Sequence, residues 1–224
     1  MSDQHNANCM SVSGHPNVKT PFLDSIAEQG VLFDNAFCNN PICSPSRLSF
    51  ITGQHPHTHG FLGNDNFNHQ SRNPNTLSAL FRRYGYQTAL IGKGHMIKKW
   101  DDEGFEHIRY CDLCDADRND PLKHHYFRYL VESGLGDLYE EGNLPQEHQH
   151  SQKGYAVSKL PYENSIERWT GNETISFIEN RDERRPFFVQ MSFQRPHPPY
   201  IPSAQHADMY SPDEIVLPEN AVDA

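Results

Sequence analysis

The stretch TLSALFRRYGYQTALIGKGHM, residues 76–96, decides the fold class of this chain. Thr76 is suited to cap the N-terminus of a helix, and Gly85 is suited to end it. Between them, apolar residues recur at helical spacing, at Leu77, Leu80, Phe81 and Tyr84. The next residues, YQTALIG, are the short apolar run of a buried strand, and the polar loop GKGHM follows. The stretch therefore predicts a helix, a strand and a loop at the carboxyl end of that strand.

A second unit of the same kind lies in the last third of the chain. The segment SIERWTGNETISFIEN, residues 165–180, places five residues on roughly one helical face, namely Ile166, Trp169, Thr170, Phe177 and Ile178. An apolar strand is expected from Phe187 to Phe193, with the loop QRPHPPYIP after it. Repeated helix-to-strand units predict an α/β fold, in which ligands gather beyond the carboxyl ends of the strands.

A short helix is expected from Thr20 to Gly30. Thr20 is placed as the N-cap and Pro21 at the first helical position. The apolar residues on one face of this helix are Leu23, Ile26 and Ala27. The residues that follow, VLFDNAFC at 31–38, are interpreted as a strand or an extended segment.

Another helix is expected to begin with Ser44 as its cap and to end at Gly53. Cys43 then stands immediately before the N-terminus of this helix. Residues 101–160 are rich in Asp, His and Gly and weakly periodic, so they are interpreted as an insertion and loops with at most short elements. The sequence has neither an internal repeat nor a linker, and residues 1–224 are treated as one domain.

The composition limits the classes of protein to which the chain can belong. Of its 224 residues 36% are hydrophobic, and 19 Lys and Arg against 29 Asp and Glu give a formal net charge of −10. These values argue against a disordered or collagen-like chain. No apolar run approaches the ~18 residues of a membrane span, and no basic block indicates nucleic-acid binding. A local pocket of Arg, Lys and His can still bind an anion.

The cysteines do not resemble a disulfide framework, because their number is odd and their spacing irregular. They are Cys9, Cys38, Cys43, Cys111 and Cys114. Cys111 and Cys114 form a single C-x-x-C pair near His124 and His125. One such pair is weak support for a zinc site, so reduced loop cysteines are the preferred interpretation.

The segment Cys43-Ser44-Pro45-Ser46-Arg47 carries the clearest chemistry. A thiol at the N-terminus of a helix lies near free backbone N–H groups and the positive end of the helix dipole, and Arg47 adds a cation one turn along. The residues alone leave three interpretations open. They are a nucleophilic cysteine of low pKa, an anion-binding turn, and a small buried residue beside a good helix cap.

The longer segment PICSPSRLSFITGQHPHTHG, residues 41–60, resembles the C-x-P-S-R and T-G signature of the type I sulfatases. Three further blocks resemble this family in the same order, TPFLDSIAEQGVLFDNAFCNNP at 20–41, LIGKGH at 90–95 and QRPHPPY at 194–200. The resemblance implies an alkaline-phosphatase-like α/β fold, with a mixed, mostly parallel sheet flanked by helices. It also implies that residues 1–224 are the truncated N-terminal part of the catalytic domain, with the first core strand and the C-terminal part missing.

The same resemblance implies a nucleophile and cofactors. The family's cysteine at the position of Cys43 is oxidised to formylglycine, whose hydrate attacks sulfur with one oxygen and expels sulfate with the help of the other. A divalent cation, Ca²⁺ first and Mg²⁺ or Mn²⁺ as alternatives, would be held by Asp3, Gln4 and residue 43. Gln4 replaces the second acid of the usual pair, similar to choline-sulfatase-like and phosphonate-monoesterase-like branches. Without the resemblance, Asp3 would be interpreted as part of a frayed terminus.

Further site residues follow from the resemblance, four of them catalytic, namely Arg47, Lys93, His95 and His197, and one substrate-binding, Asn64. Lys93 would bind a sulfate oxygen. His95 would contact the formylglycine hydroxyl and assist sulfate elimination, although Gly94 replaces the usual bulky residue between the two. His197 would contact the substrate and protonate the leaving alcohol, and Asn64 would bind a sulfate oxygen. From the residues alone, the Gly-Lys-Gly loop is an ordinary turn and His197 a surface histidine.

The predicted function is hydrolysis of a sulfate monoester. The expected partners are a small-molecule or saccharide sulfate ester and a formylglycine-generating maturation enzyme, and neither nucleic acid nor a membrane is expected. Because part of the metal shell would be missing, residues 1–224 alone are expected to be inactive. Two alternatives stay open: a phosphonate monoester or phosphodiester hydrolase on the same scaffold, and a non-catalytic anion- or glycan-binding module.

Overall fold

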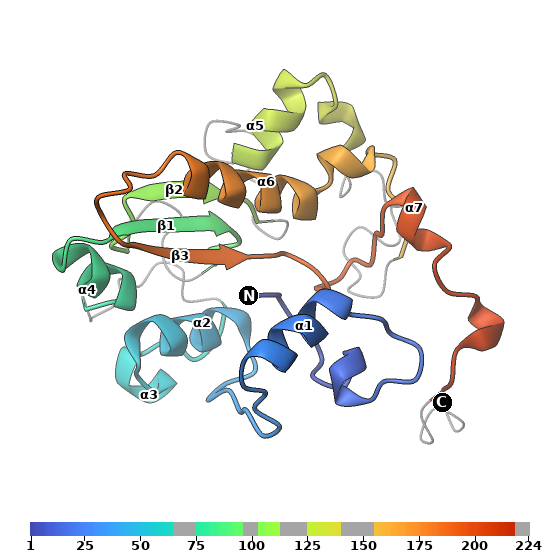
Figure 1. Ribbon diagram of the computed structural model, residues 1–224, viewed down its shortest axis with the longest axis horizontal. Helices are drawn as coiled ribbons and strands as arrows, with labels where there is room; N and C mark the ends of the chain where they lie inside the picture. The colour runs from blue at the N-terminus through green and yellow to red at the C-terminus, as the bar shows by residue number, and fades with distance from the viewer. Residues whose placement is uncertain (65–74, 96–102, 113–124, 140–154, 218–224) are drawn as a thin grey trace.

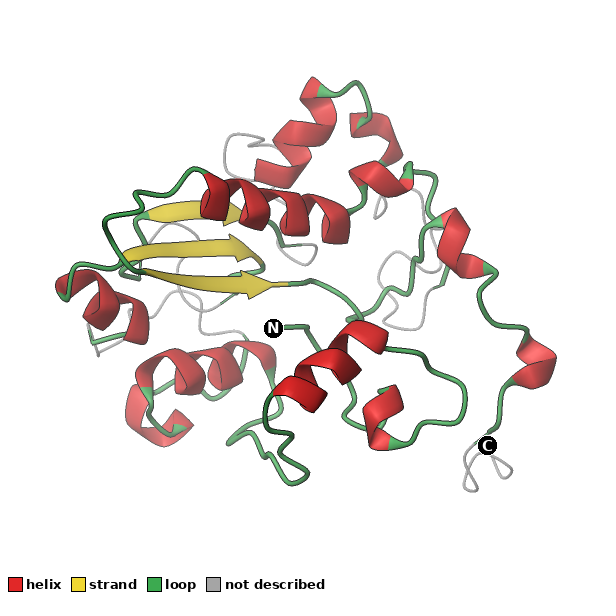
Figure 2. Ribbon diagram, viewed as in Figure 1, coloured by secondary structure: helices red, strands yellow, loops and turns green. Residues whose placement is uncertain are grey.

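A parallel sheet forms the centre of the computed structural model, which describes residues 1–64, 75–95, 103–112, 125–139 and 155–217. Three strands are described, in the spatial order β2, β1, β3 (Figure 1 and Figure 2). Their bounds are Gln87–Gly92 for β1, His107–Tyr110 for β2 and Phe187–Ser192 for β3. The strands expected near 86–92 and 187–193 are confirmed. β2 lies inside the segment interpreted as loops with short elements, and the sequence pattern missed it as a strand of the sheet.

Helices cover both faces of the sheet (Figure 1). On one side lie α5 (His125–Glu132) and α6 (Ile166–Glu179), and on the other α2 (Cys43–Thr52) and α4 (Leu77–Arg83). The remaining helices are α1 (Pro21–Gln29), α3 (Pro56–His59) and α7 (Ala204–Ala207), with 3₁₀ turns at Ser11–Ser13, Gly136–Leu138, Tyr162–Asn164 and Pro212–Glu214. In the described part of the chain, no helix has the length and apolar character needed to cross a membrane. The arrangement confirms the α/β fold with a parallel sheet flanked by helices.

An apolar cluster on each face of the sheet holds these layers together. The cluster beneath α2 consists of Leu48, Ile51, Phe61, Leu90 and Phe105. The cluster beneath α5 and α6 consists of Cys111, Tyr126, Leu130, Tyr139, Leu160, Ile166 and Trp169. Complete burial of a large apolar side chain stabilises a fold by about 1.5–3 kcal/mol, so these two clusters are the main source of stability.

The N-terminus of α2 differs from the sequence prediction. Ser44 was expected to cap the helix, but the helix begins at Cys43, and Ile42 occupies the cap position without a side-chain hydrogen bond. The side chain of Asn64 supplies the missing acceptor, because its Oδ1 accepts a hydrogen bond from the Ser44 N–H at 3.1 Å. Cys43 is therefore the first residue of the helix, beside a tip that is capped from a distant loop.

The cap and the packing of α4 agree with expectation only in part. Thr76 Oγ1 accepts a hydrogen bond from a backbone N–H of the first turn at 3.1 Å, as predicted. Phe81 stacks on Phe188 of β3 with ring centroids 4.6 Å apart. Leu80 and Tyr84, expected on the same apolar face, are exposed, because only one side of this short helix meets the sheet.

The apolar face expected for α1 is also exposed. Leu23 and Ile26 are 39% and 68% exposed, and α1 buries none of its residues. The helix packs against the turn at Ser11–Ser13 rather than against the sheet, and Ser11 Oγ donates a hydrogen bond to Asp24 Oδ2 at 2.6 Å. Residues 31–38, interpreted as a strand or an extended segment, contain a turn and form no strand.

The first residues of the chain lie along the end of β3. The Met1 ammonium group donates a hydrogen bond to the Met191 carbonyl at 2.7 Å, and the Phe193 N–H donates to the Met1 carbonyl at 2.9 Å. Ser2 and Phe193 form a parallel bridge. Asp3 is thereby fixed level with the carboxyl ends of the strands.

Gly92 ends β1 in a conformation that only glycine adopts without strain. Its φ is +97°, and a Cβ there would lie 2.0 Å from the Ser192 carbonyl oxygen. We expect Gly92→Ala to lower the free energy of unfolding by about 3 kcal/mol, because backbone strain and a clash with rigid backbone add together. Gly134→Ala is the matched control, since Gly134 has a φ of +71° with open space around it, and should cost about 1 kcal/mol. Urea unfolding measures both, and equal losses would contradict the prediction.

Candidate functional site

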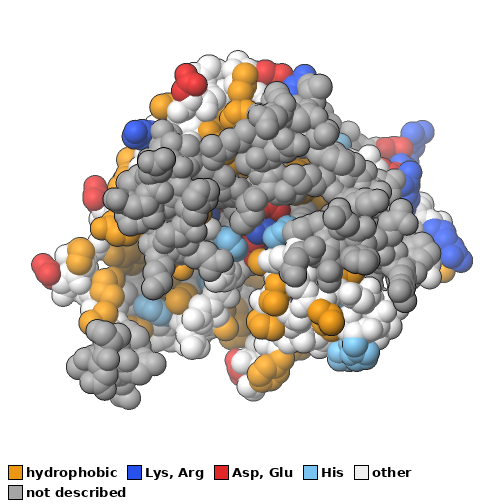
Figure 3. Space-filling model, turned by 180° about the vertical axis from the view of Figure 1, so that it is seen from behind, with side chains coloured by type: hydrophobic (Ala, Val, Ile, Leu, Met, Phe, Trp, Pro, Cys, Tyr) orange, Lys and Arg blue, Asp and Glu red, His pale blue; other side chains and the backbone are white. Residues whose placement is uncertain are grey.

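The site residues predicted from the sequence converge at the carboxyl edge of the sheet. Asp3 follows the segment that lies along β3, Lys93 and His95 follow β1 directly, and His197 lies on the loop after β3. Cys43 faces them from the first turn of α2. Basic, acidic and histidine side chains meet near the middle of the face shown in Figure 3. Because parallel strands end at one edge, residues distant in sequence share a single site here.

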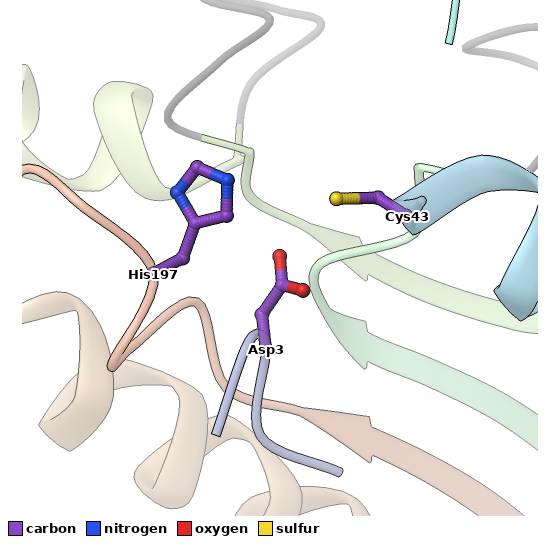
Figure 4. A group of neighbouring side chains, drawn as sticks. All are labelled: Asp3, Cys43 and His197. Atoms are coloured by element: carbon purple, nitrogen blue, oxygen red, sulfur yellow. The ribbon is translucent and has the colours of Figure 1, made fainter. Parts of the chain in front are cut away.

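Asp3, Cys43 and His197 form the centre of the site. Their side chains point toward one another (Figure 4), and one ligand atom from each lies within 4.8 Å of the other two. The His197 Nδ1 donates a hydrogen bond to the Pro198 carbonyl oxygen at 2.6 Å, since a carbonyl only accepts. In the neutral ring this leaves the Nε2 unprotonated, able to accept a proton or to bind a cation.

The Lys93 ammonium group is fully buried between two carboxylates. It forms an ion pair with Asp3, and its Nζ lies 4.0 Å from Asp112 Oδ1. The carboxylate of Asp3 also lies 3.8 Å from Arg47 Nη2. Burial raises the pKa of Asp3, but the charge and the hydrogen bond of Lys93, helped by Arg47, lower it below its ordinary value. Asp3 is thus held as a carboxylate.

Arg47 ties the first turn of α2 to the sheet. Its side chain is 4% exposed, and its Nη1 donates hydrogen bonds to the Lys93 carbonyl and to Ser192 Oγ, both at 3.0 Å. These acceptors lie at the ends of β1 and β3. The guanidinium group therefore fixes Cys43 relative to the strand ends as well as placing a positive charge beside Asp3.

His95 is buried in the loop after β1, with a φ of +47°. Burial lowers its pKa, Lys93 lowers it further, and the carboxylate of Asp112 opposes both. The residue between Lys93 and His95 is Gly94, where a Cβ would lie 2.9 Å from the ring of Tyr110. The Tyr110 ring therefore takes the space that a larger residue between them would need.

Asn64 contacts the N-terminus of α2, whereas Gln4 has no such contact with the described residues of the site. Asn64 lies at the tip of α2, bonded to the N–H of the residue next to Cys43. Gln4 is exposed, has a φ of +55°, and lines a cavity of about 980 Å³ together with Leu23 and Phe193. Among the described residues, no hydrogen bond or ion pair joins Gln4 to the rest of the site. Its role as a metal ligand stays a prediction.

Sequence reasoning missed Asp112 and Ser192. Asp112 is fully buried beside Lys93, and its Oδ2 accepts a hydrogen bond from the Tyr110 hydroxyl at 3.3 Å. Ser192, the last residue of β3, accepts the hydrogen bond from Arg47. An acid directly after a strand is a usable signal, but β2 itself was not recognised, so Asp112 was interpreted as a loop residue.

Cys111 lies in the loop directly after β2 and is buried in the core. It is fully buried, its Sγ lies 3.8 Å from Thr170 Oγ1, and burial raises the pKa of its thiol. Cys111 follows β2 outside any helix or strand, as the loop interpretation expected, but its complete burial was not foreseen. Cys114 and His124 lie outside the described residues, so the structure does not test the zinc alternative.

Comparison with known proteins gives one family and one fold. The profile of the Sulfatase family matches residues 1–220. An arylsulfatase of Clostridium perfringens is 30% identical over 97% of this chain and 46% of its own length. Among solved structures, one described as bound to its substrate D-glucosamine-2-N,6-O-disulfate is 27% identical, with a TM-score of 0.66, over 98% of this chain and 38% of that one.

A second solved structure, the phosphonate monoester hydrolase of Agrobacterium radiobacter, supports the fold alone. It has a TM-score of 0.71 at 23% identity and covers 96% of this chain and 44% of the other. The chain spans less than half the length of the arylsulfatase and of both solved structures. The shared fold therefore concerns the part of the domain that carries Asp3, Cys43, Lys93 and His197.

The buried histidines predict how stability depends on pH. Burial lowers the pKa of His59 and of His95 below 6.5, so the unfolded chain binds protons that the folded chain lacks. The free energy of unfolding should therefore fall as the pH decreases through 6.5, by up to about 1.4 kcal/mol per pH unit for each histidine. Urea unfolding at about pH 7.5 and about pH 5.5 checks this, and His95→Gln should remove part of the dependence. A midpoint that rises on acidification would contradict the prediction.

Proposed function

The chain belongs to the sulfatase family, and on this premise we propose that the full-length protein hydrolyses sulfate monoesters with residue 43, as formylglycine, as its nucleophile. One observation carries the proposal. Cys43 is the first residue of α2, and its Sγ lies within 4.8 Å of the ligand atoms of Asp3 and His197. A small nucleophile at a helix tip, beside a carboxylate and a histidine, suits attack on an anionic ester.

The reaction needs two oxygens at residue 43. A maturation enzyme would supply a two-electron oxidant that converts the Cys43 side chain into an aldehyde, with the C–S bond broken, the sulfur released as sulfide and the oxygen taken from water or dioxygen. A water molecule would then add to the aldehyde. One hydroxyl of the hydrate attacks sulfur and displaces the alcohol; the other loses its proton as the aldehyde reforms and sulfate leaves. The N-terminus of α2 stabilises negative charge on these oxygens.

The donors of the site fit a hard cation better after oxidation than before. Asp3 offers carboxylate oxygens, and residue 43 offers a soft thiol before oxidation but an oxygen after it. With the amide oxygen of Gln4, these groups would hold Ca²⁺, or Mg²⁺ or Mn²⁺ in its place. Such a cation favours deprotonation of the attacking hydroxyl and neutralises charge on the sulfate group.

The remaining residues divide binding from proton transfer. Lys93 and Arg47 place positive charge at the site, and Asn64 stands at the helix tip where a sulfate oxygen would lie. The His197 ring, with its Nδ1 bonded to a carbonyl, would have to take up a second proton on Nε2, and in this imidazolium form it would give that proton to the leaving alcohol. His95, which is buried and feels the charges of both Lys93 and Asp112, would assist elimination of sulfate.

A sulfated saccharide or a small sulfate ester is the substrate class we propose. The residues proposed to bind sulfate lie at the strand ends and at the N-terminus of α2, where they would recognise the sulfate group common to both substrates. The presence of Gln4 in place of a second acid favours one alternative, a phosphonate monoester or phosphodiester hydrolase on the same scaffold. Rates of the full-length protein on an aryl sulfate and an aryl phosphonate ester decide between them, since the preferred ester is the one hydrolysed with the higher kcat/KM.

Cys43→Ala tests the nucleophile. In the full-length protein made together with a maturation enzyme, this change should lower the hydrolysis rate by at least about 10³-fold, because it removes the covalent step. Mass spectrometry of the wild-type peptide should find an aldehyde at residue 43. Cys38→Ala is the matched control, since Cys38 is an exposed cysteine on the segment before α2, and should leave the rate unchanged.

Two results would contradict this assignment. A plain thiol at residue 43 in every active preparation would exclude formylglycine. Sulfate binding that survives in Cys43→Ala, without hydrolysis by either form, would instead support a non-catalytic anion- or glycan-binding module.

Asp3→Asn tests the cation. Titration calorimetry of the full-length protein with Ca²⁺ should give an affinity at least about 10-fold lower in the variant, because one anionic ligand becomes neutral. Asp24→Asn is the matched control, as Asp24 is a carboxylate bonded to Ser11 on α1 and belongs to no part of the site. An affinity loss of equal size in both variants would contradict the role of Asp3.

A further inference from the structure

His59 has no part in the proposed chemistry, yet it is almost completely buried. It ends α3 and is 1% exposed. Its Nε2 lies 3.1 Å from Ser49 Oγ on α2, and its Nδ1 accepts a hydrogen bond from the Phe61 N–H at 3.2 Å. Because a backbone N–H only donates, the Nδ1 is unprotonated and the proton is on Nε2, which donates to Ser49. Both ring nitrogens are therefore used, and one neutral tautomer is selected.

The segment after His59 runs back along α2 toward its N-terminus. Gly60, with a φ of +85°, makes the turn. Phe61 is 2% exposed and packs in the cluster that contains Leu48 of α2. Asn64 then reaches the tip, where its Oδ1 accepts from the Ser44 N–H at 3.1 Å. The return segment 59–64 thus contacts α2 at its middle and at its tip.

The hydrogen bond at the tip depends on where this segment lies. The Ser44 N–H belongs to the first turn of α2, and the N-cap residue Ile42 offers it no side-chain acceptor. Only four residues separate His59 from Asn64. Once His59 is fixed, the side-chain amide of Asn64 therefore has little freedom to move. This side-chain amide accepts from the N–H of Ser44, the residue after Cys43, so a shift of the return segment moves a group beside the proposed nucleophile.

We propose that His59 is a positioning residue, whose ring fixes the return segment to α2 and thereby holds Asn64 at the helix tip beside Cys43. The inference rests on the proposed function where it assigns Asn64 to the sulfate group. The competing explanation is that His59 fills space in the core, in which case a residue of similar volume would replace it without effect on the tip.

Hydrogen exchange of the Ser44 amide separates the two explanations, since that amide reports directly on Asn64. His59→Leu keeps most of the volume but removes both hydrogen bonds, and should speed exchange at Ser44 about 5- to 10-fold, as should Asn64→Ala. The double variant should exchange no faster than Asn64→Ala alone, because both act through one bond. The Gly53 amide, bonded to the Ser49 carbonyl at 2.9 Å, is the internal control and should keep its rate.

Ser49→Ala is the milder second variant, which removes the partner of Nε2 but leaves the ring in place. It should speed Ser44 exchange in the same direction and by less than His59→Leu. Unchanged exchange at Ser44 in both variants, with faster exchange in Asn64→Ala, would overturn the proposal. This measurement needs no turnover, so it decides the role of His59 even if the full-length protein hydrolyses no sulfate ester.

Activity gives the second readout. In the full-length protein, His59→Leu should raise the KM for an aryl sulfate by about the same factor as Asn64→Ala, and the double variant by no more. Effects of the two changes that multiply would show that His59 acts elsewhere. Absence of hydrolysis by the wild type would count against the proposed function alone.

Discussion

The ammonium group of Lys93, enclosed without access to solvent, is the constraint on which the site depends. A charge removed from water costs several kcal/mol unless opposite charges and hydrogen bonds surround it. Asp3 and Asp112 supply two negative charges, and Arg47, which is paired with Asp3, supplies a second positive charge, so the four groups are together neutral. Each group comes from a different element, and this cluster therefore joins the chain start, α2 and the ends of β1 and β2.

The backbone geometry at the end of β1 positions the charged side chain of Lys93. The main chain leaves the strand through Gly92, where the Ser192 carbonyl takes the place of a side chain. The Lys93 N–H donates to that same carbonyl at 2.9 Å, which keeps the loop level with the end of β3. Close packing between β1 and β3 thus requires a glycine at position 92. The same close approach of the two strand ends directs Lys93 into the site.

Much of the scaffold follows from local patterns. The strand at Gln87–Gly92 and the helix before it are predictable because an apolar run, a capping threonine and a glycine stop agree. The burial of α1 was harder to predict than its existence. Its apolar face lacks a covering layer among the described residues, and only tertiary context decides whether such a face is buried. The short strand His107–Tyr110 carries three charged or titratable side chains among four residues, and its place beside β1 follows from pairing that no local pattern reports.

The candidate site shows the same division. Cys43, Arg47, Lys93 and His197 are found by motif, and the structure brings them together. The sequence did not predict the role of Asp112, because the strand before it was not recognised. It did not predict the cap of α2 either, because the acceptor comes from another loop. Gln4 follows Asp3 directly in sequence, but it has a positive φ and lines the cavity with Leu23 and Phe193, so its role as a ligand stays a prediction.

During synthesis of this chain, the segment around Cys43 appears well before the residues that hold it in place. Arg47 and Ser192, which lock the first turn of α2 onto the sheet, are 145 residues apart. At ribosomal rates of about 5–20 residues per second, roughly 7–30 seconds pass between their appearance. During that interval the nascent segment around Cys43 lacks its final partners, whereas in the finished domain Arg47 holds it against the strand ends.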